Sequence, residues 1–204
     1  MNLRQDIDNE IFHLIGDVAD ELGREAYVVG GYVRDIFLKR CSTDIDFVTI
    51  GSGIELAQKV SERLGKKSHL SVFATYGTAQ VKWKNLELEF VGARRESYSR
   101  DSRNPIVEDG TLDDDQKRRD FTINAMAYNE SKGLVDIFGG MEDIKKGMIR
   151  CVGNPIERFN EDALRIMRAI RFSARLGYEI EEETKNAIKV LAPNLAKISA
   201  ERVQ

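Results

Sequence analysis

The chain has 204 residues, which is enough for one large domain or two small ones with a buried core. Hydrophobic residues make up 42% of it and charged residues 32%, with only three prolines, so a collagen-like or broadly disordered chain is excluded. The 31 basic and 34 acidic side chains leave a formal net charge of -3, which gives no overall signal of a nucleic-acid-binding protein.

The sequence also indicates where the chain is located. No run approaches the roughly 18 apolar residues of a membrane span, and residues 1–10 are polar and acidic, unlike a signal peptide. Cys41 and Cys151 fit neither a metal motif nor a disulfide framework, so we expect a cytoplasmic protein without a membrane partner. With His13 and His69 as the only histidines, histidine-based zinc sites and Ser-His-Asp hydrolysis are disfavoured.

The first quarter of the chain predicts a helix, a strand, a helix and a strand. Apolar residues recur at three- and four-residue steps over residues 6–22, which indicates an amphipathic helix that ends at Gly23. The apolar run 26–29 indicates a short strand, and Gly30 and Gly31 turn the chain into a helix over residues 32–38. Residues 44–50 alternate polar and apolar side chains, as a strand does.

The middle of the chain predicts a helix, three strands and a long connection. A helix with apolar residues at positions 56, 60 and 64 follows a glycine turn, and strands are expected at residues 70–74, 78–84 and 86–91. Asn85 marks the tight turn between the last two strands. Residues 94–115 show no periodicity and are rich in arginine, aspartate and serine, so we expect a long, mobile loop there.

The last part of the chain predicts mainly helices. Residues 118–125 open a helix, a strand lies around residues 134–135, and helices follow at residues 161–176 and 181–191. We expect a mixed α/β head over residues 1–153 and a helical neck over residues 154–204. Because the chain ends just after Ser199 begins another helix, we expect the natural protein to continue.

Several carboxylates are placed to hold a divalent metal ion. Asp44 and Asp46 lie two apart on a predicted strand, so their side chains share one face. Glu87 and Glu89 share the outer face of a later strand, and periodicity does not choose between them. Oxygen ligands of this kind suit Mg²⁺. Taken singly, an Asp-X-Asp pattern or an outward pair of glutamates is more often ordinary surface.

Other residues are suited to nucleotide binding. Gly30 and Gly31 expose backbone N–H groups at a helix start, where an anion can bind, and Arg34 follows one turn later. Asn124, inside an apolar stretch, requires a hydrogen-bonding partner. If residues 161–176 form one helix, Asp162 and Arg165 are neighbours on its polar side, and such a pair can read the edge of a base. An ordinary salt-bridged helix surface is the alternative for that pair.

Five strings in this order resemble the nucleotidyltransferase superfamily that includes class II CCA-adding enzymes and bacterial poly(A) polymerases. They are VGGYVRD at residues 29–35, DIDF at 44–47, EFVGAR at 89–94, RRDFTINA at 118–125, and RFNEDALR at 158–165 continuing to AIRF at 169–172. The resemblance implies an α+β fold: a polymerase-β-like nucleotidyltransferase head, with a small mixed sheet flanked by helices, followed by an all-helical neck.

The resemblance also implies roles for individual residues. Asp44, Asp46 and Glu89 match the catalytic, metal-binding positions, with Mg²⁺ as the cofactor. The nucleotide-binding positions are matched by nine residues: Gly30, Gly31, Arg34, Arg119, Asp120, Asn124, Asp162, Arg165 and Arg168. Asp162 and Arg165 match the pair that selects CTP and ATP without a nucleic-acid template.

The implied activity is the addition of CCA to tRNA 3′ ends from CTP and ATP, by attack of the terminal hydroxyl on the α-phosphate. The motifs leave open a poly(A) polymerase, an A-only or CC-only enzyme acting on tRNA or another RNA 3′ end, and a non-catalytic RNA- or nucleotide-binding module. They also leave the oligomeric state open.

Overall fold

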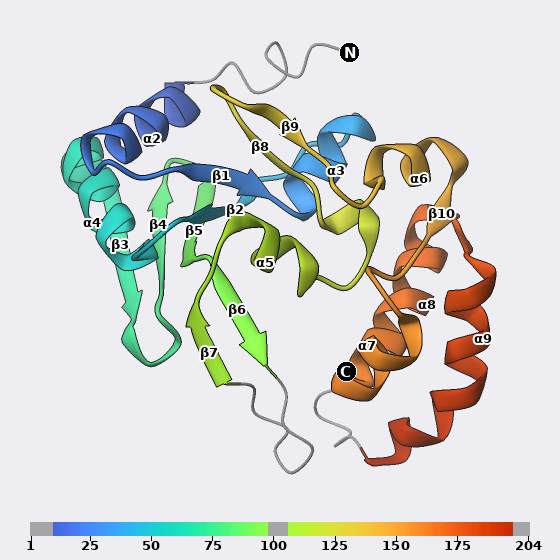
Figure 1. Cartoon of the computed structure of the whole chain (residues 1–204). Helices are drawn as coiled ribbons and strands as arrows, with labels where there is room; N and C mark the ends of the chain where they lie inside the picture. Colours follow the sequence, from blue (N-terminus) through green and yellow to red (C-terminus); the bar gives the residue numbers. More distant parts are fainter. Residues whose placement is uncertain (1–9, 98–105, 198–204) are drawn as a thin grey trace.

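A computed structural model describes residues 10–97 and 106–197 (Figure 1). Within these residues, seven strands form one mixed sheet in the order β3-β4-β5-β2-β1-β8-β9. Its strands are β1 (Ala26–Val29), β2 (Asp44–Thr49), β3 (Ser68–Phe73), β4 (Thr78–Trp83), β5 (Leu86–Gly92), β8 (Ala127–Asn129) and β9 (Gly133–Val135). In this sheet β2 and β5 pair in parallel and the other neighbours pair antiparallel. The predicted strands at both ends of the Asn85 turn are therefore confirmed.

Two long helices cover one face of the sheet. Helix α2 (Glu10–Glu21) buries Ile11, Ile15 and Val18, the stripe expected from its three- and four-residue spacing. Helix α4 (Gly53–Leu64) begins at Ser52, whose side chain accepts a hydrogen bond from the backbone N–H of Glu55. Both helices pack on the same row of strand side chains, among them Val28, Ile45, Phe47, Val81 and Phe90.

The other face of the sheet is covered over only part of its width. Helix α5 (Leu112–Lys117) packs through Leu112 against Tyr27, Val29, Val48 and Ala127 of the strands β1, β2 and β8. Over the outer strands β3 and β4 the corresponding side chains stay accessible. The half of this face formed by β3, β4 and β5 is therefore accessible, and it adjoins β2, the strand that carries Asp44 and Asp46.

Two sequence predictions are wrong in this region. Residues 94–115 contain the antiparallel strands β6 (Arg94–Ser97) and β7 (Ile106–Asp109) and the start of α5, where a continuous loop was expected. The N-terminus of α5 is fixed by a capping box between Thr111 and Asp114, a signal that apolar periodicity does not detect. Residues 98–105, the centre of the predicted loop, lie outside the described residues.

Residues 118–125 also differ from the expectation of a helix. They contain a single 3₁₀ turn, η3 (Thr122–Asn124), after which the chain enters strand β8. The backbone N–H of Phe121 donates to its neighbour Asp120, so this part of the segment is organised by side-chain hydrogen bonds rather than by helical ones.

The remaining elements connect strands of this sheet or follow its last strand in the chain. They are α3 (Gly31–Phe37), α6 (Gly140–Lys146), β10 (Met148–Ile149), α7 (Pro155–Glu161), α8 (Leu164–Leu176), β11 (Glu179–Ile180), α9 (Glu182–Leu191) and the 3₁₀ turns η1 (Gly65–Lys67), η2 (Ala74–Tyr76) and η4 (Ala192–Lys197). Most of the helix predicted over 161–176 is α8, which begins at Leu164, whereas Glu161 is the last residue of α7. Strand β11 adds a short strand to the predicted neck. The helix expected from Ser199 lies outside the described residues. No helix among the residues described has the length and apolarity needed to cross a membrane.

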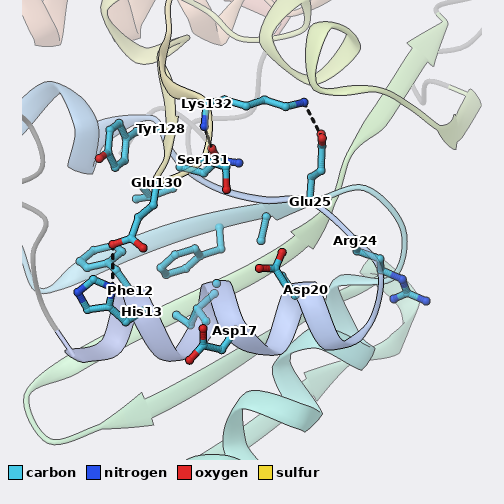
Figure 2. Close-up of a pocket in the computed structure, with 17 residues that line it drawn as sticks. Phe12, His13, Asp17, Asp20, Arg24, Glu25, Tyr128, Glu130, Ser131 and Lys132 are labelled. Carbon is cyan, nitrogen blue, oxygen red and sulfur yellow. Dashed lines mark hydrogen bonds and ion pairs between the residues drawn. The ribbon is translucent and has the colours of Figure 1, made fainter.

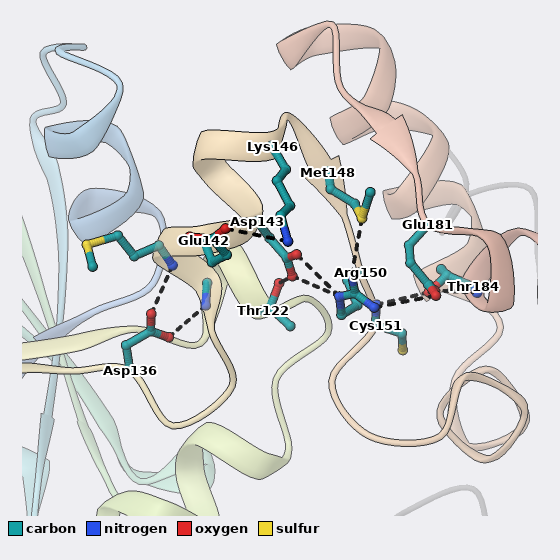
Figure 3. A network of polar contacts seen from close by, with 12 residues as sticks. Thr122, Asp136, Glu142, Asp143, Lys146, Met148, Arg150, Cys151, Glu181 and Thr184 are labelled. Carbon is teal, nitrogen blue, oxygen red and sulfur yellow. Dashed lines mark hydrogen bonds and ion pairs between the residues drawn. The ribbon is translucent and has the colours of Figure 1, made fainter.

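The predicted boundary at residue 153 crosses a continuous core. Phe121 and Ile149, before the boundary, pack in one cluster with Phe159, Ile166 and Ala169, after it. A polar network runs beside this cluster (Figure 3): Thr122 donates to Asp143 at 2.6 Å, Arg150 pairs with both Asp143 and Glu181, and Thr184 accepts from the backbone N–H of Cys151. The division into head and neck stays a prediction.

Candidate active site

Four carboxylates lie on one face of the sheet where β2 and β5 pair. The parallel register places Asp44 beside Glu87 and Asp46 beside Glu89. Because side chains alternate along a strand, all four point to the face that α5 partly covers. The sequence therefore brings the predicted metal ligands onto adjacent strands.

The two glutamates have different surroundings. Glu87 accepts hydrogen bonds from Lys82 Nζ at 2.8 Å and from Gln80 Nε2 at 3.3 Å, so its charge is already compensated. Within the described residues, no hydrogen bond or ion pair involves the Glu89 carboxylate, which instead acts electrostatically on Asp46. This difference separates the two residues that periodicity alone left equivalent.

Asp46 is a partly buried carboxylate that lies beside Glu89. Burial, and then the negative charge of Glu89, raises the pKa of Asp46 to about 6, although Arg119 acts in the opposite direction. A partly buried carboxylate beside a second one is the kind of site that a bound cation stabilises.

No formed metal centre accompanies this arrangement. Across residues 10–97 and 106–197, no three acidic, histidine or cysteine side chains lie close enough together to hold a metal ion. Mg²⁺ usually takes one or two protein carboxylates and completes its shell with water and phosphate oxygens, so Asp46 and a neighbour fit its chemistry. Ligation by Asp44, Asp46 and Glu89 stays a prediction.

Gly30 brings the backbone close to the carboxylates and to Arg119. Its φ of 72° and ψ of -132° belong to a region that side chains disfavour. A Cβ on Gly30 would lie 2.9 Å from Arg119 Nη1 and 3.7 Å from Asp46 Oδ2. Arg119 is itself held by the fully buried Asp115, which also pairs with Arg118. Only glycine leaves room for this arrangement.

We expect Gly30→Ala to weaken nucleotide binding at least tenfold and to lower the free energy of unfolding by about 1–3 kcal/mol, because the new methyl group strains the backbone and displaces Arg119. The check is a titration with ATP and CTP, together with urea unfolding. Gly31→Ala is the matched control, since its Cβ would meet its nearest neighbour, Arg34, at an ordinary 3.5 Å. Equal effects of the two substitutions would contradict this explanation.

Four of the predicted nucleotide-binding residues form one chain of hydrogen bonds. Arg168 Nε donates to Asp120 Oδ2 at 2.6 Å, and Asn124 Nδ2 donates to Asp120 Oδ1 at 3.1 Å. Arg34 Nη1 in turn donates to Asn124 Oδ1 at 2.7 Å, while Arg34 also pairs with Asp35. Asn124 thus has the partners that its place in an apolar stretch requires, and the chain links α3 to α8.

The predicted side-chain contact between Asp162 and Arg165 is wrong, because each of the two side chains has other partners. Asp162 ends α7 with an extended backbone, at φ -146° and ψ 106°, and its side chain accepts a hydrogen bond from the backbone N–H of Leu164. Arg165, which is 8% exposed, donates instead to Glu161 and to the carbonyl oxygens of Arg158 and Arg118. The break between the two helices changes their phase, which a single helical wheel cannot anticipate.

All nine predicted nucleotide-binding residues line one open cleft of about 600 Å³, and Asp46 forms part of its wall. Sequence reasoning did not assign Arg118, Phe172 or Arg175 to the site, although they line the same cleft. Phe172 lies beneath two guanidinium groups, with the carbon of Arg34 at 5.3 Å and that of Arg168 at 5.4 Å from its ring centre. Phe172 lies four residues after Arg168 and Arg175 three residues after Phe172 on α8, a helical spacing that could have indicated both, and Arg118 directly precedes Arg119.

A second, more enclosed cavity of about 230 Å³ lies on the opposite side, between α2 and the β8–β9 turn (Figure 2). His13 and Glu130 face each other across its edge at 2.9 Å, and Lys132 pairs with Glu25 at 2.5 Å. None of the predicted catalytic or nucleotide-binding residues lines it. The arginine-rich cleft is therefore the candidate site.

The sequence is similar to CCA-adding and A-adding enzymes over most of its length. It is 43% identical over 189 residues to the CCA-adding enzyme of Leuconostoc mesenteroides, covering 91% of this chain and 45% of that protein. It is 46% identical over 168 residues to the A-adding tRNA nucleotidyltransferase of Aquifex aeolicus, covering 80% of this chain and 20% of that protein. The chain thus spans less than half the length of these relatives.

The fold matches solved structures of the same kind. A tRNA nucleotidyltransferase complexed with a primer tRNA and an incoming ATP analogue superposes with a TM-score of 0.81 at 40% identity, covering 93% of this chain and 53% of the other. The apo form II of a CCA-adding enzyme superposes with a TM-score of 0.85 at 36% identity, covering 95% and 46%. These matches confirm the predicted fold, a nucleotidyltransferase head with a mixed sheet.

Two family models match separate parts of the chain. Residues 177–204 match the probable RNA and SrmB-binding site of polymerase A. Residues 26–150, which carry the carboxylates and most of the cleft, match the poly A polymerase head domain. The chain belongs to the poly A polymerase head-domain family.

Proposed function

We propose that this chain is the catalytic part of a template-independent RNA nucleotidyltransferase that adds CCA to tRNA 3′ ends from CTP and ATP. The observation that carries the proposal is the position of Asp46, which belongs both to the carboxylate-bearing sheet face and to the wall of the arginine-rich cleft. Relatives and structural neighbours with the names CCA-adding enzyme and tRNA nucleotidyltransferase support it. The cytoplasm is its expected location, which the free thiols of Cys41 and Cys151 support.

In this proposal the cleft binds the nucleoside triphosphate. Arg118, Arg119 and Arg168 supply positive charge for the phosphates, and Gly30 lets the triphosphate approach the backbone. Asp120 and Asn124 hold Arg168 and Arg34 in place through the hydrogen-bond chain described above, and Asp115 holds Arg118 and Arg119. At the α8 end of the cleft, the guanidinium of Arg165 is fixed in orientation by three acceptors and, with Asp162, is positioned to read the base.

The reaction would occur where the cleft meets the sheet. The 3′-hydroxyl oxygen of the RNA would attack the α-phosphorus and form a new phosphodiester bond, and the hydroxyl proton would pass to solvent. The bond between the α-phosphorus and the oxygen shared with the β-phosphate would break, so that pyrophosphate leaves. Asp44, Asp46 and Glu89 would hold Mg²⁺, which when bound neutralises phosphate charge and favours the deprotonated hydroxyl. The protein itself contributes mainly positioning, through the fixed arginines and the strand register.

The test is incorporation of labelled nucleotides by the purified protein with Mg²⁺. On tRNA that lacks its last three nucleotides, we expect two C residues from CTP, then one A from ATP, and no incorporation once EDTA removes the metal. Extension of arbitrary RNA by ATP alone would contradict CCA addition and support a poly(A) polymerase. Nucleotide binding without any transfer would support a non-catalytic module.

An A-adding enzyme is the second candidate, because the Aquifex aeolicus relative with 46% identity has that name. The same assay separates it from the first candidate. An A-adding enzyme extends tRNA that already ends in CC but does not add C to tRNA that lacks all three nucleotides.

A further inference from the structure

The sheet face that carries the catalytic carboxylates continues over the outer strands β4 and β3. Strand register places three rows of side chains across this face, each running from β3 through β4 and β5 to β2. The rows are His69, Lys82, Glu87 and Asp44; Ser71, Gln80, Glu89 and Asp46; and Phe73, Thr78, Val91 and Val48. The contact of Lys82 and Gln80 with Glu87 agrees with this alignment.

The outer part of this face is accessible. Helix α5 covers Val48 and Val91, at the β2 end of the third row, but Phe73 at the β3 end is 47% exposed. His69, Lys82 and Glu89 are also exposed. The opposite face of β4 is buried under α4 through Ala79 and Val81. A large aromatic side chain is thus presented to solvent in a polar surrounding.

The position of the cleft indicates the side from which the RNA reaches Asp46. The triphosphate cleft lies on the side of Asp46 formed by Gly30, Arg119 and α8, so pyrophosphate leaves towards that side. In an in-line displacement the attacking oxygen enters opposite the leaving group. The RNA 3′-hydroxyl therefore approaches Asp46 from the side of Glu89, which is the side of β5, β4 and β3.

We propose that the half-face of β3, β4 and β5 is the track for the single-stranded 3′ end of the RNA, with Phe73 as the stacking platform for a base that precedes the terminal nucleotide. The inference rests on the proposed function and deepens it. Phe73 lies roughly 14 Å from the Asp46 strand, three strand spacings of about 4.8 Å, which places it beyond the terminal nucleotide. Gln80 lies between the two on β4 and can donate a hydrogen bond to the RNA.

Stacking explains why an aromatic side chain is left exposed at this point. Single-stranded RNA is held largely by stacking of bases on aromatic rings, which tolerates any base. An acidic surface beside the catalytic carboxylates disfavours phosphate contacts, so binding through base faces fits this half-face better than binding through charge.

The experiment compares Phe73→Ala with Val72→Ala. Val72 directly precedes Phe73 on β3 and is 43% exposed. Because side chains alternate along a strand, the Val72 side chain points to the opposite face, so this substitution is a matched control. We expect Phe73→Ala to raise the KM for tRNA primer about tenfold, with the KM for CTP and ATP unchanged, since stacking on one ring contributes about that factor. Phe73→Trp should restore primer KM, whereas Val72→Ala should leave it unchanged.

A second readout locates the RNA directly. Primer with 4-thiouridine within the last three nucleotides should cross-link to the peptide of residues 68–83 when irradiated with the unmodified protein. Equal primer KM values for Phe73→Ala and Val72→Ala, or cross-links confined to α2, would overturn the track while leaving transfer intact. Absence of transfer by the unmodified protein on any RNA would overturn both the track and the proposed function.

Discussion

Asp46→Asn is expected to lower the rate of nucleotide transfer about a thousandfold. Asn keeps the size of the side chain but removes the charge at the point where the carboxylate face meets the cleft. The arginines and the hydrogen-bond chain that bind the triphosphate are untouched, so nucleotide affinity should change little. Single-turnover incorporation on tRNA, together with titration of ATP and CTP, measures the two quantities separately.

Glu89→Gln and Glu87→Gln form a matched pair of controls for this result. Both glutamates lie on β5 and face the same side, but Glu87 is bonded to Lys82 while Glu89 acts on Asp46. We expect Glu89→Gln to reduce transfer strongly and Glu87→Gln to leave it close to that of the unmodified protein. The reverse order would assign the third carboxylate to Glu87, and unchanged transfer in Asp46→Asn would remove the metal site from the mechanism.

Asp115→Asn is expected to reduce the free energy of unfolding by about 3 kcal/mol. Asp115 is fully buried and pairs with Arg118 at 2.5 Å and with Arg119 at 2.9 Å, so removing its charge uncouples two partly buried cations. The expected loss is at the lower end of the range for breaking a buried ion pair, because both arginines keep some contact with water. Urea unfolding should show a lower midpoint with an unchanged slope.

Asp113→Asn is the control, since Asp113 lies on the same helix turn but is exposed. It should change stability by no more than a few tenths of a kcal/mol. Asp115→Asn should in addition weaken ATP binding, because Arg119 lines the cleft. Equal midpoints for the two variants would show that the buried pair does not stabilise the fold.

Elements with an apolar stripe could be predicted from the sequence. The spacing in α2 and α4 and the alternation in β2, β4 and β5 follow from which side of each element meets the core. The segment around Arg94 and Asp109 could not be predicted, because its strands form a separate two-stranded sheet instead of adding to the main one. The break at Asp162 was missed because no glycine or proline marks it.

The site was predictable where a residue type is tied to its chemistry, and less so where tertiary contacts decide. Asp44 and Asp46 were singled out by their spacing, whereas the different surroundings of Glu87 and Glu89 depend on Lys82, a residue of the neighbouring strand. Asp115 was not assigned a role, although its spacing of three and four residues from Arg118 and Arg119 on a helix could have indicated one.

The hydrophobic cluster shared by Phe121, Ile149, Phe159 and Ile166 limits how this molecule can be divided or recombined. Separation of the chain after residue 153 would bring apolar side chains on both pieces into water, so neither half is suited to independent existence. Exchange of catalytic halves between relatives would require matched packing at this seam. A substitution on one side of the seam therefore changes the packing of the other side, and a chimaera is best joined at an exposed turn elsewhere.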